Sequence, residues 1–249
     1  MASRKVRHSQ RTILLFALLA GCRETEHKTP PPPAPPPQAQ QGFTEVHKVA
    51  LMEQHYVAAI AAHDQLLRGD LDGFRSRMGG LAAQALPSLA PEAWRAGHAR
   101  MIDAAKEASV AADAGSAGAR MGTLVETCGS CHAANLKGPV YRTPLPNPGD
   151  GTVSANMRKH QWATERLWEG ITGPWDDAWR RGASALAEAD YLPPQLRTPA
   201  LRALEADIRE LGKAAMAATT VTQRVEVYGR ILAQCGRCHV AADVVFKQP

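Results

Sequence analysis

Two short segments of this chain place thiols and an imidazole at a spacing that could do chemistry. Both read Cys-x-x-Cys-His: the first holds Cys128, Cys131 and His132, and the second holds Cys235, Cys238 and His239. Residues three positions apart lie close to one turn apart on a helix, so both thiols face one side and the histidine follows directly. Such a pair of thiols can add to the two vinyl groups of a haem while the histidine binds the iron.

Two other kinds of site also use Cys-x-x-Cys. A thioredoxin-like redox pair belongs in a βαβ unit, which the pattern of this chain does not predict, and a zinc site needs four ligands in a closed knuckle. Here each motif is followed by a histidine, and each ends one half of an internal repeat. The sequence therefore predicts two haem c groups attached through the four thiols, with His132 and His239 as the proximal ligands of the iron.

The elements that position these motifs are predicted to be helices. From Phe43 onward the chain is rich in alanine, has helical spacing of its apolar residues, and is interrupted by Gly, Pro and Asp. We expect helices at about 43–68, 71–86, 91–112, 117–133, 154–171, 175–189, 196–217 and 220–238. The expected fold class is all-α, with two tandem four-helix bundles and a haem at the end of each fourth helix.

The two halves of this helical region repeat one another. Met52-Glu-Gln-His55 matches Met157-Arg-Lys-His160, and the halves then stay in register without a gap over the next predicted helix. The register slips by only two residues before the motifs, because Cys128 lies 73 residues after His55 and Cys235 lies 75 after His160. A duplicated helical domain is the simplest explanation.

An attachment motif at the end of a fourth helix resembles the class II c-type cytochromes, the cytochrome c′ family and its low-spin relatives, which are four-helix bundles. The common small cytochrome c fold has its motif near the N-terminus and a later methionine ligand. It is excluded for the second half, because only ten residues follow His239 and none is Met or His. The basic residue that cytochrome c′ carries soon after its haem histidine is absent or displaced here, which argues against five-coordinate, gas-binding behaviour.

A second axial ligand could come from the first helix of each half. In an up-down-up-down bundle the start of helix one and the end of helix four lie at the same end. His55 and His160 are therefore predicted as the distal ligands, and Met52 and Met157, one turn earlier, are the alternative that the class II resemblance implies. Histidine is favoured because His160 is the only histidine of the second half outside its motif. The remaining possibility is that these histidines line the bundle without touching iron.

Other polar and aromatic residues are expected to be structural. His47, His63 and His98 have no histidine counterpart in the second half and are expected at the surface or between helices. Arg75 and Arg180 could pair with haem propionates or form ordinary salt bridges. The four tryptophans of the second half are expected mostly to fill the core.

The start of the chain predicts export. Four basic residues precede a short apolar run at 13–20, which is too short for a stable membrane span. The run closes with Leu19-Ala20-Gly21-Cys22, which resembles a bacterial lipoprotein cleavage box and implies acylation of Cys22. The residue after the cysteine is Arg23 and not Asp. By resemblance to the enteric lipoprotein sorting rule, in which Asp at this position retains the protein in the inner membrane, this slightly favours the outer membrane. An ordinary signal peptide with an incidental Cys22 is the alternative.

A proline-rich tract follows Cys22 and is expected to adopt polyproline II and to hold the folded part away from the membrane. The predicted organisation is a signal peptide at 1–21, a lipidated cysteine and spacer at 22–42, a first haem-binding domain at 43–137, a Pro/Gly-rich linker at 138–153 and a second haem-binding domain at 154–249.

Composition agrees with this organisation. The chain has 249 residues and a formal charge of +5, but four of its 29 basic side chains and none of its 24 acidic ones lie in the signal peptide. The charge therefore gives no signal for nucleic acid. One cysteine for lipid and four for haem use all five thiols.

The expected function is a periplasm-facing, lipid-anchored dihaem cytochrome c that carries single electrons between other periplasmic or membrane redox proteins. An electron carrier rather than an enzyme is favoured, because two six-coordinate irons leave no position for a substrate. The alternative is a gas-binding or peroxidase-like dihaem protein with at least one five-coordinate haem.

Overall fold

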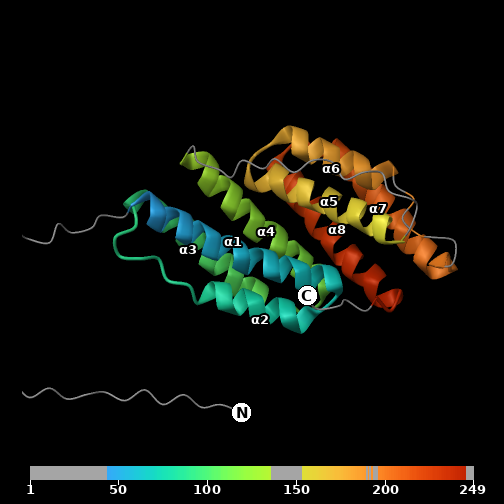
Figure 1. Cartoon of the computed structure of the whole chain (residues 1–249), viewed down its shortest axis with the longest axis horizontal. Helices are drawn as coiled ribbons and strands as arrows, with labels where there is room; N and C mark the ends of the chain where they lie inside the picture. Colours follow the sequence, from blue (N-terminus) through green and yellow to red (C-terminus); the bar gives the residue numbers. More distant parts are fainter. Residues whose placement is uncertain (1–43, 136–152, 189, 191, 193–195, 245–249) are drawn as a thin grey trace, which may run out of the picture. The chain divides into compact units, whose positions relative to one another are not determined.

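Helices make up the regular structure of the chain. The computed structural model describes residues 44–135, 153–188, 190, 192 and 196–244, and within them it has eight α-helices and no strand (Figure 1). The helices are α1 (Glu45–Arg68), α2 (Leu71–Ala82), α3 (Glu92–Ser109), α4 (Ala114–Ala134), α5 (Val153–Thr172), α6 (Asp176–Glu188), α7 (Pro199–Ala217) and α8 (Val221–Ala241). The all-α prediction is confirmed, and each predicted helix is present with ends displaced by a few residues.

Polar residues at the helix ends explain most of these boundaries. The carboxylate of Asp70 accepts a hydrogen bond from the backbone N–H of Gly73 at 2.8 Å and so caps α2. Gly69, which ends α1, has a φ of 76°, a conformation that glycine adopts without steric cost. Residues 114–116 were expected to separate two helices, but Asp113 and Ser116 form a capping box there, so α4 starts at Ala114.

Helices that are neighbours in sequence pack against each other, and the two halves also share an extensive interface. Helix α4 contacts α8 at least as extensively as it contacts α3, and α1 packs more against α8 than against α4. Helix α4 likewise packs more against α5 than against α1. The described residues form one compact unit. The first and fourth helices of each half therefore meet helices of the other half (Figure 1).

The α4–α8 crossing depends on glycine. A Cβ atom added at Gly229 would lie 2.5 Å from the carbonyl oxygen of Gly118, and one added at Gly118 would overlap the carbonyl oxygen of Gly229. A Cβ at Gly122 would lie 2.6 Å from the carbonyl oxygen of Val225. The two backbones are therefore in direct contact, which only residues without a side chain permit.

Large side chains fill the core on both sides of this crossing. Phe74 and Met78 are fully buried in the first half, and Trp179 and Tyr228 are fully buried in the second. Trp162 and Trp168 are also buried, as expected. Trp175 is the exception among the four, being 41% exposed because it precedes α6 and lies outside the packed helix faces.

Several predictions concern residues outside the described part of the chain. The signal peptide at 1–21, Cys22 with the spacer at 22–42, and the linker at 138–153 up to residue 152 lie there. Among the described residues, no helix is both long enough and apolar enough to cross a bilayer.

Candidate functional site

Both Cys-x-x-Cys-His segments lie in the last turns of helices, the first on α4 and the second on α8. All four of their cysteines are free thiols. Burial raises the pKa of Cys235 to about 12, and burial together with the neighbouring Cys131 raises the pKa of Cys128 to about 11. Both thiols are therefore protonated near pH 7.

The histidine of each motif is fixed by one hydrogen bond. Nδ1 of His239 lies 2.6 Å from the carbonyl oxygen of Leu67, and Nδ1 of His132 lies 2.8 Å from the carbonyl oxygen of Thr172. A carbonyl oxygen only accepts, so Nδ1 carries the hydrogen in both rings and the lone pair is on Nε2. Metal-binding histidines typically have this arrangement, in which the outer hydrogen bond sets the tautomer and the ring orientation.

These two hydrogen bonds join the halves in a symmetric manner. Leu67 lies near the end of α1 and Thr172 at the end of α5, and they are 105 residues apart, as are His55 and His160. Each motif histidine therefore bonds to the first helix of the other half, at the same position. The sequence repeat shows that Leu67 and Thr172 occupy equivalent positions, but it does not show that each of them bonds to the motif histidine of the other half.

The glycine within each motif permits this approach. A Cβ at Gly236 would lie 2.5 Å from the carbonyl oxygen of Leu66, and a Cβ at Gly129 would overlap the carbonyl oxygen of Ile171. Both motifs read Cys-Gly-x-Cys-His, so the shared glycine was visible in the sequence. It allows the end of α8 to lie against the end of α1, and the end of α4 against the end of α5.

The second motif borders a cavity of about 540 Å³. Cys235, Cys238 and His239 of α8 line it, together with Met157 and His160 of α5. Residues of α1 in the first half, including His63 and Leu67, also line the cavity, as does Glu205 of α7. This volume lies within the range typical of cofactor and ligand sites. The structure thus brings the predicted proximal residues and both candidate distal residues of the second half to one cavity.

His160 lies beside the motif within this cavity. Its Nε2 is 3.7 Å from Sγ of Cys235, and the residue is 9% exposed. Burial, followed by the positive charge that His239 can carry, lowers the pKa of His160 to about 4. The ring is therefore neutral at neutral pH, as a metal ligand must be. Met157 is partly buried and lines the same cavity, so the methionine alternative stays open for the second half.

The first half places His55 beside a second histidine. The ring centroids of His55 and His98 are 5.4 Å apart, and Nε2 of each ring is shielded from solvent and has no hydrogen-bond partner among the described residues. Burial, followed by His98, lowers the pKa of His55 to about 4. Met52 is 38% exposed on α1. The arrangement therefore favours His55 over Met52 as a buried ligand.

Two further histidines lie on α1. His47 hydrogen-bonds to Thr44 at the exposed start of the helix. His63 is buried and lines the second cavity, where it stacks on Tyr228 at a centroid distance of 6.3 Å and meets the edge of Trp168 at 5.6 Å. Its Nε2 has no hydrogen-bond partner among the described residues. Trp168 is the repeat counterpart of His63, so the two equivalent positions contact each other.

Neither of the repeated arginines, Arg75 and Arg180, is among the described residues that line the second cavity. Arg75 donates to the carbonyl oxygens of Ala111 and Ala112 and pairs with Asp72, which ties α2 to the loop before α4. Arg180 is exposed and pairs with Asp177 at 3.8 Å. Both arginines thus have the salt bridges that were the alternative to a propionate contact.

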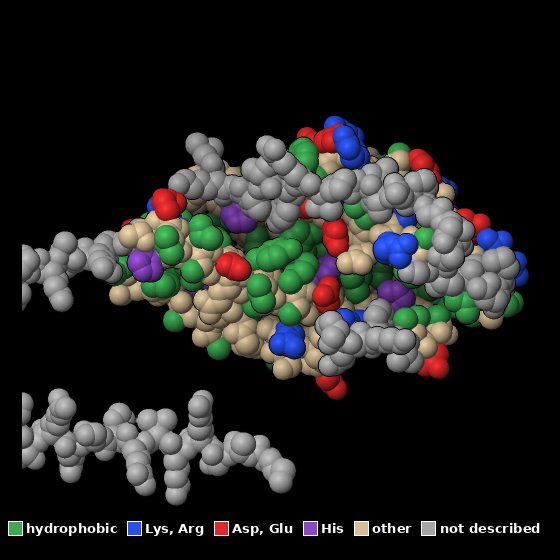
Figure 2. All heavy atoms as spheres, viewed as in Figure 1, with side chains coloured by type: hydrophobic (Ala, Val, Ile, Leu, Met, Phe, Trp, Pro, Cys, Tyr) green, Lys and Arg blue, Asp and Glu red, His purple; other side chains and the backbone are tan. Residues whose placement is uncertain are grey.

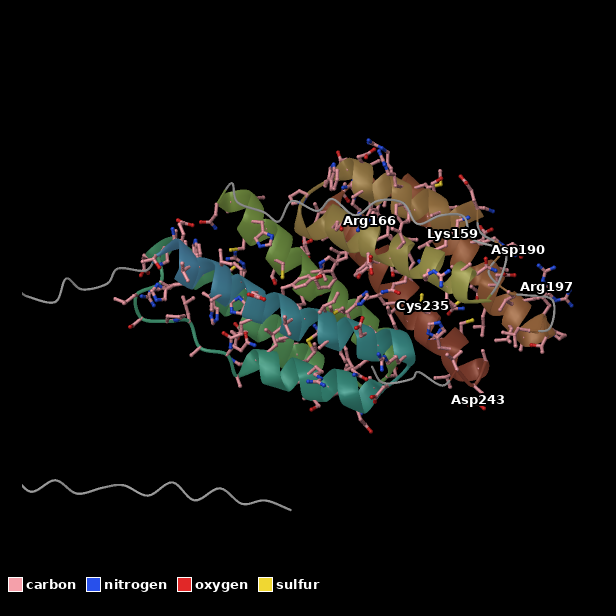
Figure 3. The ribbon with its side chains drawn as sticks, viewed as in Figure 1. Lys159, Arg166, Asp190, Arg197, Cys235 and Asp243 are labelled. Carbon is pink, nitrogen blue, oxygen red and sulfur yellow. The ribbon has the colours of Figure 1, made fainter. Side chains whose placement is uncertain are left out.

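A buried ion pair of α5 also lines the second cavity. Arg166 and Glu169 pair with each other and are 4% and 3% exposed. Figure 3 labels Arg166 on α5 and Cys235 on the neighbouring α8. Burial raises the pKa of Glu169 to about 7, although Arg166 opposes the shift. Glu169 corresponds to Asp64 in the first half, but Arg166 corresponds to Ala61, so the repeat gave no indication of the pair.

On the outside of the first half, α1 exposes apolar side chains. Val46, Val49 and Val57 are 76%, 64% and 55% exposed. Figure 2 shows hydrophobic side chains gathered over this helix on the face that it draws. This surface lies on the same helix that provides His55 and the carbonyl of Leu67.

The donor set fits a covalently attached haem better than a bare metal ion. Among the described residues no group of three or more His, Cys, Asp and Glu side chains is placed to hold a metal ion. A haem supplies its own equatorial nitrogens and asks the protein only for attachment and axial ligands. Two thiols, a histidine with its lone pair on Nε2 and a second, neutral histidine at the same cavity are the kinds of residue that such a group requires. No family model, curated protein or solved structure matches the chain.

Proposed function

We propose that this protein is a dihaem c-type cytochrome that carries single electrons. In this proposal α1–α4 and α5–α8 are tandem four-helix sets, each with a haem c at the end of its fourth helix. Cys128 and Cys131 hold the first haem through thioether bonds, and Cys235 and Cys238 hold the second.

The observation that carries the proposal is the matched pair of hydrogen bonds at the motif histidines. Nδ1 of His132 and Nδ1 of His239 each donate to a backbone carbonyl, at 2.8 and 2.6 Å. Two unrelated surface motifs would have no reason to share this arrangement at equivalent positions. A histidine held in this tautomer directs its Nε2 lone pair away from the carbonyl, as a proximal iron ligand requires.

When bound, a haem supplies an iron that gains and loses one electron at a time. The chain supplies the environment that this change needs. His55 and His160 would bind the iron through neutral nitrogens, and the buried side chains that line the second cavity would limit the access of water to it. Exclusion of water strengthens the interactions of the surrounding charges with the iron and so tunes its potential.

A histidine on each side of both irons would leave no open position for substrate, and this favours electron transfer over turnover. Lipid on Cys22 would hold the protein at a bacterial membrane facing the periplasm, where its partners would be other redox proteins. A dihaem protein with one open iron, which binds gas or acts as a peroxidase, is the alternative that spectroscopy distinguishes.

The test is to express the full chain in a host that matures c-type cytochromes. Denatured wild-type protein should retain two haems per chain. The double variant Cys128→Ser/Cys131→Ser and the double variant Cys235→Ser/Cys238→Ser should each retain one. The visible and EPR spectra should be low-spin and unchanged when carbon monoxide is added to the reduced protein. Loss of all haem on denaturation would refute the proposal, and a high-spin fraction that binds carbon monoxide would support the alternative.

A further inference from the structure

We propose that the first haem site has two interchangeable histidine ligands in addition to His132, namely His55 of α1 and His98 of α3, whereas α7, the helix equivalent to α3, offers no histidine to the second site. The inference rests on the haem sites proposed above and adds a residue from α3 to the first of them. It also makes the two sites chemically different, although the halves that hold them repeat one another.

The two histidines of the first site share one environment. Their ring centroids are 5.4 Å apart with the ring planes at 44°, and the rings come from α1 and α3. Nε2 of each is buried and lacks a hydrogen-bond partner in the part of the chain that the structure describes. A buried polar atom without a partner is costly, and native structures retain one mainly where it has a function. Two such nitrogens together indicate a shared ligand-binding role.

Gly97, the residue before His98, lies against the first motif, so this turn of α3 is close to it. A Cβ atom added at Gly97 would lie 2.8 Å from Sγ of Cys131, so the backbone of α3 passes directly over the second thiol of the motif. His98 is the next residue along the same turn. It therefore lies close to where a haem held by that thiol must be.

The second half supports this placement independently. Glu205 follows His98 by 107 residues, the same separation as Cys238 from Cys131, and Glu205 lines the cavity that contains Cys238 and His160. Glu205, the residue equivalent to His98, thus lines the second cavity. Comparison of the halves pairs His98 with about Glu205, but neither residue was assigned to a predicted site, and His98 was expected at the surface or between helices.

Both carboxylate oxygens of Glu205 have partners in the protein, whereas Nε2 of His98 has none among the described residues. Its Oε1 accepts a hydrogen bond from the backbone N–H of Leu192 at 2.8 Å, and its Oε2 lies 3.7 Å from the guanidinium of Arg209. A carboxylate whose two oxygens are both engaged in this way is not presented to an iron. His160 therefore has no equivalent substitute from α7.

The experiment compares single and double histidine variants in the full-length, haem-loaded protein. His55→Ala and His98→Ala should each keep both haems low-spin, because the other histidine binds in its place. The double variant should convert half of the haem to a high-spin form, and added imidazole should restore the low-spin spectrum. His160→Ala is the matched control and should change one haem by itself, to high-spin or to a histidine–methionine spectrum if Met157 binds.

Haem content per chain and helical content by circular dichroism are measured for every variant, and His55→Gln and His98→Gln repeat the test with side chains closer in size. The inference is overturned if His55→Ala alone produces as much altered haem as His160→Ala. It is also overturned if His98→Ala alone does so, or if the double variant stays low-spin. Failure of the proposed function is a separate result, since wild-type protein would then lack covalent haem.

Discussion

His239 and Leu67 belong to different halves of the chain, yet Nδ1 of His239 donates to the carbonyl oxygen of Leu67 at 2.6 Å. The equivalent bond runs in the opposite sense from His132 to Thr172 at 2.8 Å. Each half therefore completes the site of the other. A histidine without its carbonyl partner would lose both its fixed tautomer and its orientation, and the second cavity would lose the wall that α1 provides.

Replacing Gly236 by alanine tests whether this contact supports the second site. The new Cβ would lie 2.5 Å from the carbonyl oxygen of Leu66 and would push the end of α8 away from α1. We expect the free energy of unfolding to fall by about 1–3 kcal/mol, the usual cost of overpacking. Haem retained at the second motif should also fall, while haem at the first motif should be unchanged.

The control is Gly79→Ala on α2, where an added Cβ would meet nothing within 4 Å. Alanine there should stabilise the helix by about 0.5–1 kcal/mol, since glycine is the poorer helix former. Equal effects of Gly236→Ala and Gly79→Ala in denaturant unfolding would show that the α1–α8 approach is not tight.

The interface between the halves is tested at Gly118. A methyl group there would overlap the carbonyl oxygen of Gly229 at the crossing of α4 and α8. Because both contacting groups are backbone, neither can rotate away, and we expect Gly118→Ala to lower the free energy of unfolding by at least about 2 kcal/mol. Chemical denaturation followed by circular dichroism measures the change, with Gly80→Ala as the control because its added Cβ is also in open space. A loss no larger than that of the control would contradict direct backbone contact.

The helices could be predicted because their signals are local. Periodic apolar residues and breaks such as Gly69-Asp70 depend only on neighbouring residues, and the structure places helix ends at these breaks. The start of α4 was misplaced because Ser116 was interpreted as part of a break, whereas its side chain completes the cap with Asp113. Ser, Asp and Gly occur both in loops and in first turns, so composition alone does not distinguish the two.

The contacts between the halves could not be predicted, since each half contains a complete helical pattern of its own. The repeat shows that Leu67 and Thr172 are equivalent, but an equivalence holds whether a motif histidine bonds within its half or across to the other. Only the close crossing at Gly118 and Gly229 decides this, and it depends on distant parts of the chain meeting. The sequence shows that His98 has no histidine counterpart, but not that it lies beside His55, because the two residues are distant in sequence and meet only through the packing of α1 and α3.

Cys22 lies outside the described residues, and its predicted role can be tested in cells. Cys22→Ser should move the protein from the membrane fraction to the soluble periplasmic fraction, because the cleavage box can no longer be acylated. Haem per chain should be unchanged, since both attachment motifs lie elsewhere in the chain. Retention of the variant in washed membranes would contradict lipid anchoring through this residue.

Glu169 should make stability depend on pH. Burial raises its pKa from 4.5 to about 7, with Arg166 opposing and Glu165 adding to the shift. Between these two values the folded chain keeps a proton that the unfolded chain has lost, so the free energy of unfolding should decrease as pH rises from about 4.5 to about 7.

Glu169→Gln cannot ionise and should flatten this part of the profile. The absolute stability of the variant is also expected to change, because Arg166 loses its carboxyl partner, so the slope rather than the level is the informative measurement. Denaturant unfolding at several pH values gives the slope, and Glu226→Gln on the exposed side of α8 is the control. An unchanged slope in Glu169→Gln, relative to wild type and to this control, would refute the assignment of the proton to Glu169.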